Sequence, residues 1–164
     1  IDGMVTDADD DYLGGDAFTY AVHSDNGYWF TNGSGSSWVT SHNSGGTYPD
    51  HCISIALDLD NNKFYFGING TWENSGDPTS GATGTGAKAI AAASTTPTGH
   101  WFPAVSDKHN AYNIQLDMNF GGTAAFGATA VASANADDNG YGNFEFDVPA
   151  GFYALCTKNL AEFG

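Results

Sequence analysis

Basic residues and long apolar runs are scarce in this chain of 164 residues. Only 4 Lys and Arg oppose 19 Asp and Glu, which gives a formal net charge of −15. Such a surface repels phosphate backbones and anionic headgroups, and four basic residues cannot form the basic stripe that nucleic-acid binding needs. No apolar run reaches the roughly 18 residues of a membrane-spanning helix. We therefore expect no nucleic-acid partner and no membrane insertion.

Cysteine is also scarce, because Cys52 and Cys156 are the only two. No CxxC or Cys/His metal spacing occurs, and both residues adjoin apolar runs, so free thiols are the expectation. A single disulfide is the alternative if their strands are neighbours. No leader pattern is visible, and the chain opens Ile1-Asp2-Gly3 without Met, which suggests a processed product or a portion of something longer.

Short alternating patterns are abundant. Apolar residues alternate with polar or small ones in three segments: Ile53, Ile55, Leu57 and Leu59; Phe64, Phe66 and Ile68; and Ile114, Leu116, Met118 and Phe120. This period places one face of each segment in a core and the other in water. With 22 Gly and no long helical pattern, it predicts an all-β fold, an antiparallel β-sandwich with long Gly-rich loops. We expect a single domain over residues 1–164.

Two hairpins have the clearest turn chemistry. Ala17–His23 and Gly27–Thr31 flank Asn26-Gly27, a strong hairpin signal. His51–Leu59 and Lys63–Ile68 flank Asn61-Asn62, which tolerate the positive φ of a type I′ turn. Further strands are predicted at His100–Ser106, Asn113–Phe120, Phe144–Val148 and Phe152–Thr157.

Three stretches rich in small residues, 32–50, 74–99 and 121–143, are predicted to be surface loops. Poorly patterned short strands are an alternative for 32–50, and a short helix or strand is an alternative at Lys88–Ala93. Loops of this length in a compact domain commonly bind partners. We therefore expect these stretches to form the contact surface.

Aromatic and polar residues in these stretches are the candidate binding residues. Trp38 and Trp72 adjoin Gly-rich turns, whereas Trp29 and Trp101 lie inside predicted strands and are expected in the core. The candidates are Trp38, Tyr48, Trp72, Tyr112, Asp137 and Asn139. Their rings would supply apolar contact and their polar groups hydrogen bonds.

Two acidic clusters raise calcium binding as an alternative. Asp7, Asp9 and Asp11 crowd together near the start, and Asp137–Asn139 precede a glycine. No downstream Glu completes the EF-hand pattern. A solvated loop is therefore preferred, and no cofactor is expected.

Catalytic patterns are weak. Glu145 and Asp147 share a face of a predicted strand and could act as a glycosidase pair, but an outward strand face explains them equally well. No G-x-S-x-G elbow or phosphate-binding loop occurs. We do not expect an enzyme.

Several sequence words occur in an order that is typical of one family. They are IALDLDNNKFYFGINGTWENSGDP, GHWFPAVSD, NIQLDMNFG and FDVPAGFYALCTKNL, preceded by DYLGGDAFTYAVHSDNGYWFTNGSGSSW. Over about residues 12–160 the chain resembles the SPRY family, especially versions in virion proteins of tailed bacteriophages. The resemblance implies a bent sandwich of two antiparallel sheets, related to concanavalin-like lectin folds, that binds partners through its loops.

The resemblance also implies a place and a role. It implies a non-enzymatic structural or adhesive module at the surface of a virion, a capsid decoration or tail-fibre component. Its partners would be other virion proteins or a host-surface protein or glycan. We expect a homo-oligomer or part of a larger assembly, because edge strands need cover. A carbohydrate-binding, lectin-like domain is the alternative.

The chain departs from the family pattern in two places. The initial strand with a K/R-x-Y/W-W/Y-E pattern is missing, so the first strand is expected upstream or from another chain. The stretch 121–143 is longer than usual and is expected to make a specific contact.

Overall fold

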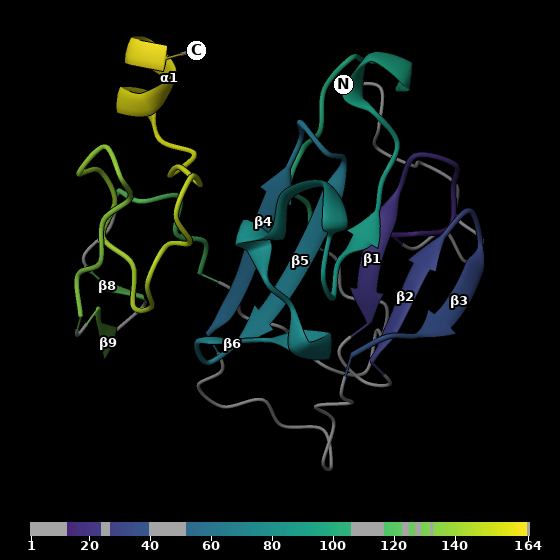
Figure 1. Ribbon diagram of the computed structural model, residues 1–164, viewed down its shortest axis with the longest axis horizontal. Coiled ribbons are helices and arrows are strands. Elements are labelled where there is room, and N and C mark those ends of the chain that lie inside the picture. Colours follow the sequence, from purple (N-terminus) through teal and green to yellow (C-terminus); the bar gives the residue numbers. More distant parts are fainter. Residues whose placement is uncertain are drawn as a thin grey trace. The chain divides into compact units, whose positions relative to one another are not determined.

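The computed structural model describes residues 13–23, 27–39, 52–105, 117–122, 125–126, 129–131 and 133–163 (Figure 1). This part of the chain is mostly β, with antiparallel sheets of three and four strands and few helices, in agreement with the all-β prediction. The chain divides into two compact units. The first lies within 1–50 and 88–114, and the second within 51–87 and 115–164.

The sheet of the first unit has the order β1-β2-β3. The strands are β1 (Tyr20–His23), β2 (Tyr28–Thr31) and β3 (Ser34–Ser37). The predicted first hairpin is confirmed, with His23 opposite Tyr28. β3 lies inside the stretch predicted as loop or short strands. It follows Asn32-Gly33, which both have positive φ, as a type I′ turn requires.

The second sheet has the order β4-β5-β6, and β7 also pairs with β5. Its strands are β4 (Ile53–Asp58), β5 (Lys63–Ile68), β6 (Thr71–Trp72) and β7 (Lys88–Ala89). The predicted second hairpin is confirmed, because Ile53 pairs with Ile68 and Asp58 with Lys63. β7 confirms the strand alternative for the start of Lys88–Ala93.

The turn between β4 and β5 differs from the two-residue turn that we predicted. It spans four residues, 59–62, and only Asn62 has positive φ. The carboxylate of Asp58 accepts hydrogen bonds from the backbone N and the Nδ2 of Asn61, at 2.9 and 2.8 Å. This side-chain cap stabilises the wider turn, which turn-residue preferences alone do not specify.

The predicted core face of β4 is wrong. The side chain of Ile55 is 57% exposed, and Ile53, Leu57 and Leu59 are exposed too, whereas Ala56 on the opposite face is 5% exposed. Ala56 pairs with Tyr65, whose side chain is 1% exposed and is the largest that is fully buried. Tyr65 contacts Ser80 in the following segment, so this segment covers the face that carries Ala56 and Tyr65. On β5, Phe66 is buried as predicted.

The stretch 74–99, predicted as an extended loop, contains short helices. They are the 3₁₀ helices η1 (Glu73–Ser75), η2 (Pro78–Thr83) and η3 (Ala93–Thr95). Pro78 and Ile90 in this stretch are buried. Part of this stretch is therefore buried and is not an exposed loop.

The strand predictions for the second half are wrong where the structure describes them. Residues 101–105, 117–120 and 145–155 are not strands, and Phe144 makes a single bridge to Asn135. The elements found are β8 (Ala125–Phe126), β9 (Thr129–Ala130) and α1 (Thr157–Phe163). Residues 106–116, with half of the predicted strand Asn113–Phe120, lie outside the described residues. Among the described residues, no helix has both the length and the apolar character needed to cross a membrane.

Both cysteines are free, as expected, and half-buried. Burial, and to a smaller extent the negative charge of Glu145, raises the pKa of the Cys52 thiol. A thiol with a raised pKa is less often ionised and therefore less reactive.

Candidate functional site

A pocket of ≈ 400 Å³ beside Trp72 in the second unit is the best candidate for a binding site, and we call it the Trp72 pocket. Its walls come from the sheet, from the segment through η1 and η2, and from residues 146–149. The side chains that line it include the aromatic Trp72 and Phe146, the carboxylates Asp77 and Asp147, and the hydroxyls Ser54, Thr71 and Thr79.

The indole of Trp72 is held in a fixed position. Trp72 ends β6 opposite Gly67, and a Cβ atom at Gly67 would lie 3.0 Å from Cε3 of the indole. Glycine at position 67 therefore allows the ring to pack directly on the backbone of β5. The ring of Tyr65 meets the indole in a T-shaped arrangement, with the centroids 6.5 Å apart. Such aromatic pairs favour one orientation, so the indole is preorganised.

The wall next to Trp72 is fixed by a capping turn. The Oδ1 atom of Asp77 accepts hydrogen bonds from the backbone N of Thr79 at 2.9 Å and from its hydroxyl at 2.7 Å. Asp before Pro78 is a good start for a helical turn, because the proline needs no hydrogen-bond partner there. The Asp77 carboxylate therefore keeps a defined place at the rim.

A second set of hydrogen bonds ties this wall to the sheet. The Ser80 hydroxyl donates to the carbonyl of Asp77 at 2.6 Å and accepts from the backbone N of Thr85 at 2.9 Å. The hydroxyl of Tyr65 lies 3.3 Å from the Ser80 Oγ. The buried side chain of Tyr65 on β5 therefore contacts both Ser80 in the loop and the indole of Trp72.

The lining of the pocket includes acidic side chains but no basic ones among the described residues. Asp77 and Asp147 both line it, and no Lys, Arg or His is among its described lining residues. The indole can stack on a flat or apolar group, and the neighbouring carboxylates and hydroxyls can accept hydrogen bonds from that group. This arrangement is suited to binding.

Of the predicted binding residues, the structure places Trp72 at this pocket. The sequence does not mark Asp77 or Phe146 as binding residues, and it suggests Asp147 only as half of a catalytic pair. The string Asp77-Pro78-Thr79 does carry a helix-start signal, but it does not reveal that the start lies beside Trp72. Glu145 and Asp147 lie outside any strand, so the shared strand face that suggested a glycosidase pair is absent in this segment.

Trp38 belongs to an internal cluster rather than to a surface platform. We call Tyr20, Trp29, Trp38 and Trp101 the aromatic cluster. The rings of Trp29 and Trp38 are T-shaped at 5.4 Å, and the Lys88 ammonium lies 5.8 Å from the Trp38 ring centroid. These contacts hold the half-buried indole of Trp38 against the first unit, and its role in binding stays a prediction.

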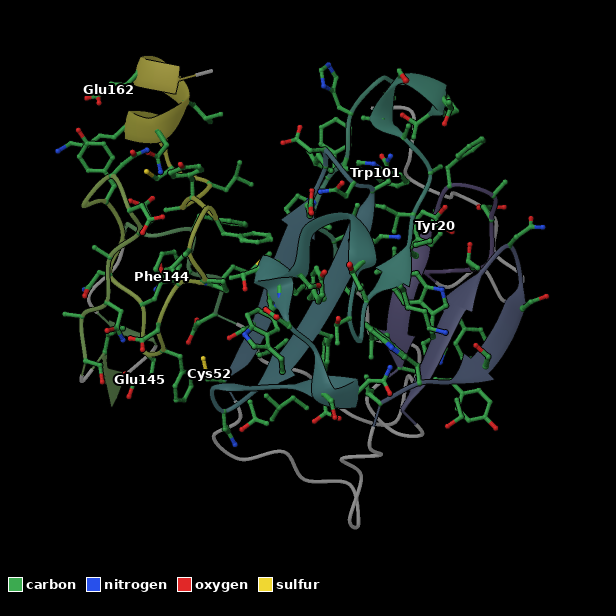
Figure 2. The ribbon with its side chains drawn as sticks, in the orientation of Figure 1. Tyr20, Cys52, Trp101, Phe144, Glu145 and Glu162 are labelled. Carbon is green, nitrogen blue, oxygen red and sulfur yellow. The ribbon has the colours of Figure 1, made fainter. Side chains whose placement is uncertain are left out.

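Trp29 and Trp101 are inside this cluster, as predicted. Tyr20 stacks on Trp29 at 5.3 Å and meets Trp101 at the same distance with tilted rings. Tyr20 and Trp101 are labelled in Figure 2. Trp29 is 5% exposed. The hydroxyl of Tyr20 accepts a hydrogen bond from the backbone N of Ala91 at 2.9 Å. The cluster is therefore the core of the first unit.

Asp137 is an internal hydrogen-bond centre. It is 6% exposed, and its carboxylate accepts from the backbone N of Asn139, Tyr141 and Ala154 and from Nδ2 of Asn159, at 2.7 to 3.0 Å. Burial raises the pKa of Asp137, but these four hydrogen bonds outweigh it and hold the pKa below its usual value.

Asn139 is used in the same way, because its Nδ2 donates to Oδ1 of Asn159 at 2.9 Å. Asp137 and Asn139 thus join residues 137–154 to α1, and a role for them in binding stays a prediction. The oxygens of Asp137 that calcium would need already accept from N–H groups. Among the described residues, no group of three or more His, Cys, Asp or Glu is placed to hold a metal ion.

The remaining candidates lie outside the described residues. They are Tyr48 and Tyr112, proposed for binding, and Asp7, Asp9 and Asp11, proposed for calcium. Their roles stay predictions.

Comparison of the chain with protein-family models, with curated proteins and with solved structures found no match. The resemblance to the SPRY family therefore stays a prediction from the sequence words.

Proposed function

We propose that this chain is a non-catalytic recognition module of a virion, a capsid decoration or tail-fibre component, that contacts its partner through the Trp72 pocket. The observation that carries the proposal is the fixed indole of Trp72 between a Gly67 backbone and a capped loop. A preorganised aromatic group with polar neighbours is typical of contact sites that dominate binding energy. The resemblance to phage SPRY domains supports the virion assignment.

The partner is another virion protein or a host-surface group. The formal net charge of −15 favours a partner with basic groups through long-range attraction. The edge strand β3 is exposed along its whole length, which supports association of copies in an assembly. Both features suit a module that acts as part of a particle.

Photo-crosslinking in purified particles tests this proposal. A photoreactive phenylalanine analogue replaces Thr71, an exposed lining residue, and in a matched variant it replaces Asp60, which is exposed in the β4–β5 turn. We expect crosslinks to a virion or host-surface component from position 71 and few from position 60. Absence of the chain from the particles, or equal crosslinking from both positions, would rule out the proposal.

Carbohydrate binding is a second candidate, because an indole beside carboxylates and hydroxyls also suits a sugar ring. A glycan array probed with and without a chelator tests it. Binding that Trp72→Ala abolishes would favour this candidate, and loss on chelation would restore the calcium alternative.

A further inference from the structure

We propose that the Trp72 pocket takes a basic side chain, with arginine preferred over lysine, from a protein partner. This inference rests on the proposed function and names the chemistry of its ligand. Two carboxylates, Asp77 and Asp147, share one pocket with the Trp72 indole, and none of the described residues that line it is basic. A group that carries positive charge and a flat face satisfies both features at once.

The hydrogen-bonding state of the two carboxylates supports a cation. Asp77 uses Oδ1 for its capping turn, so Oδ2 has no bonding partner among the described residues. Asp147 is exposed and makes no hydrogen bond within the described part of the chain. Both carboxylates attract a cation that enters the pocket, whereas a neutral sugar gains no such attraction.

The geometry of guanidinium explains the preference for arginine. Its planar fork donates to two carboxylates and stacks on an indole at the same time, whereas an ammonium is a more strongly hydrated point charge. The Trp72 ring is already fixed by Gly67 and Tyr65, so little ordering is needed on binding.

The occupant is a different protein rather than a second copy of this chain. The sequence contains no arginine and four lysines: Lys63, Lys88, Lys108 and Lys158. Lys88 lies over the ring of Trp38 and Lys158 over that of Tyr141. The side chain of Lys63 packs against Gly84. Lys108 lies outside the described residues. The chain therefore offers few basic groups to a copy of itself.

Fluorescence anisotropy with short peptides tests the inference. The probes are three fluorescein-labelled peptides: Gly-Arg-Gly, the same peptide with lysine in place of arginine, and the same peptide with citrulline in its place. Citrulline keeps the shape of arginine without its charge. Measurements at about 150 mM salt shorten the screening length to about 8 Å and suppress general attraction to the acidic surface. We expect the arginine peptide to bind roughly tenfold tighter than the citrulline peptide, with lysine between them.

Matched charge variants separate the pocket from the general charge. Asp147→Asn and Asp60→Asn each remove one exposed carboxylate, but only Asp147 lines the pocket. We expect Asp147→Asn to weaken the arginine peptide by roughly fivefold, Asp77→Asn by a similar factor, and Asp60→Asn by less than about twofold. Asparagine also caps helical turns, so Asp77→Asn preserves the loop.

Three outcomes would overturn the inference: equal binding of the arginine and citrulline peptides, equal effects of Asp147→Asn and Asp60→Asn, or binding of neutral methyl glycosides without binding of the arginine peptide. A titration of the wild-type protein that leaves the Trp72 indole N–H resonance unmoved would do the same without relying on any variant. In each case the proposed function survives if position 71 still crosslinks selectively in particles, so the two proposals fail separately.

Discussion

The hairpin of β1 and β2 and the hairpin of β4 and β5 were both predicted from the sequence, but they differ in how their large side chains are buried. In the first, the bulky Trp29 is buried in the aromatic cluster, as its pattern predicts. In the second, Ile55 is exposed while the small Ala56 is buried beside Tyr65. Alternation therefore indicates which residues share a face but not which of them are buried, since Phe66, which pairs with Ile55, is buried while Ile55 is exposed.

The largest expected effect concerns the aromatic cluster. Trp29→Ala removes a buried indole that contacts both Tyr20 and Trp38. We expect the free energy of unfolding to fall by about 3–5 kcal/mol. Urea denaturation followed by tryptophan fluorescence measures this loss. A loss below about 1 kcal/mol would show that the cluster is not the core of the first unit.

Acid should affect the second unit through Asp137. Its pKa is lowered in the folded state, so its contribution to stability is full above the unfolded pKa of about 3.9 and is lost as the pH falls through the lower, folded value. Asp137→Asn should cost about 1–3 kcal/mol at pH 7, because the hydrogen bonds to a buried charge are weakened.

Urea denaturation at pH 7 and in steps down to pH 2 measures both effects. The variant should lose less stability between pH 4 and 2 than the wild type. An unchanged slope with pH would contradict the role assigned to this carboxylate. Asp60→Asn, at an exposed position, is the control and should leave both the stability and its pH dependence nearly unchanged.

A smaller effect is expected at the link between the sheet and the Trp72 pocket. Tyr65→Phe keeps the buried ring but removes the hydroxyl that contacts Ser80. We expect a loss of about 1 kcal/mol in the free energy of unfolding and weaker binding at the pocket, because the η2 wall is held less firmly. Thermal unfolding and peptide anisotropy measure the two effects. Unaltered binding would mean that the wall keeps its place without this contact.

The smallest effect is expected on the exposed face of β4. Ile55→Ser should change the free energy of unfolding by no more than about 0.5 kcal/mol, because the side chain is already exposed. The difference between the two hairpins depends on this result. A loss above about 2 kcal/mol would show that Ile55 is covered in solution. The two hairpins would then no longer differ in the burial of their large side chains.

Local chemistry predicts the hairpins of this chain but not its site. Asn26-Gly27 and the apolar segments around it suffice to predict a hairpin, because hairpin contacts are close in sequence, and the structure supplies the register, with His23 opposite Tyr28. The Trp72 pocket joins residues 54, 72, 77 and 147, and no periodicity relates such distant positions. Trp72 itself was found because a large ring beside a turn is unusual.

The second half of the chain shows why a carboxylate in a loop is a weak indicator of a binding site. Asp137 was selected as a binding residue because it is acidic and lies in a loop, yet its oxygens are taken up by backbone N–H groups and Asn159. The sequence does not show which loop N–H groups lack other partners. The predicted strands after residue 143 fail for a related reason. The backbone N of Ala154 donates to the Asp137 carboxylate, and the carbonyl of Glu145 accepts from Nδ2 of Asn135, so side chains take the place of a neighbouring strand.

The aromatic cluster also gives the molecule an optical property. The indoles of Trp29 and Trp38 are 5.4 Å apart and nearly perpendicular, so their excited states couple and should produce paired bands of opposite sign in circular dichroism. Trp72 belongs to the other unit, and the difference in emission between the wild type and Trp72→Phe isolates its signal. Melting curves recorded from these two signals would reveal whether the units lose their structure together or one after the other.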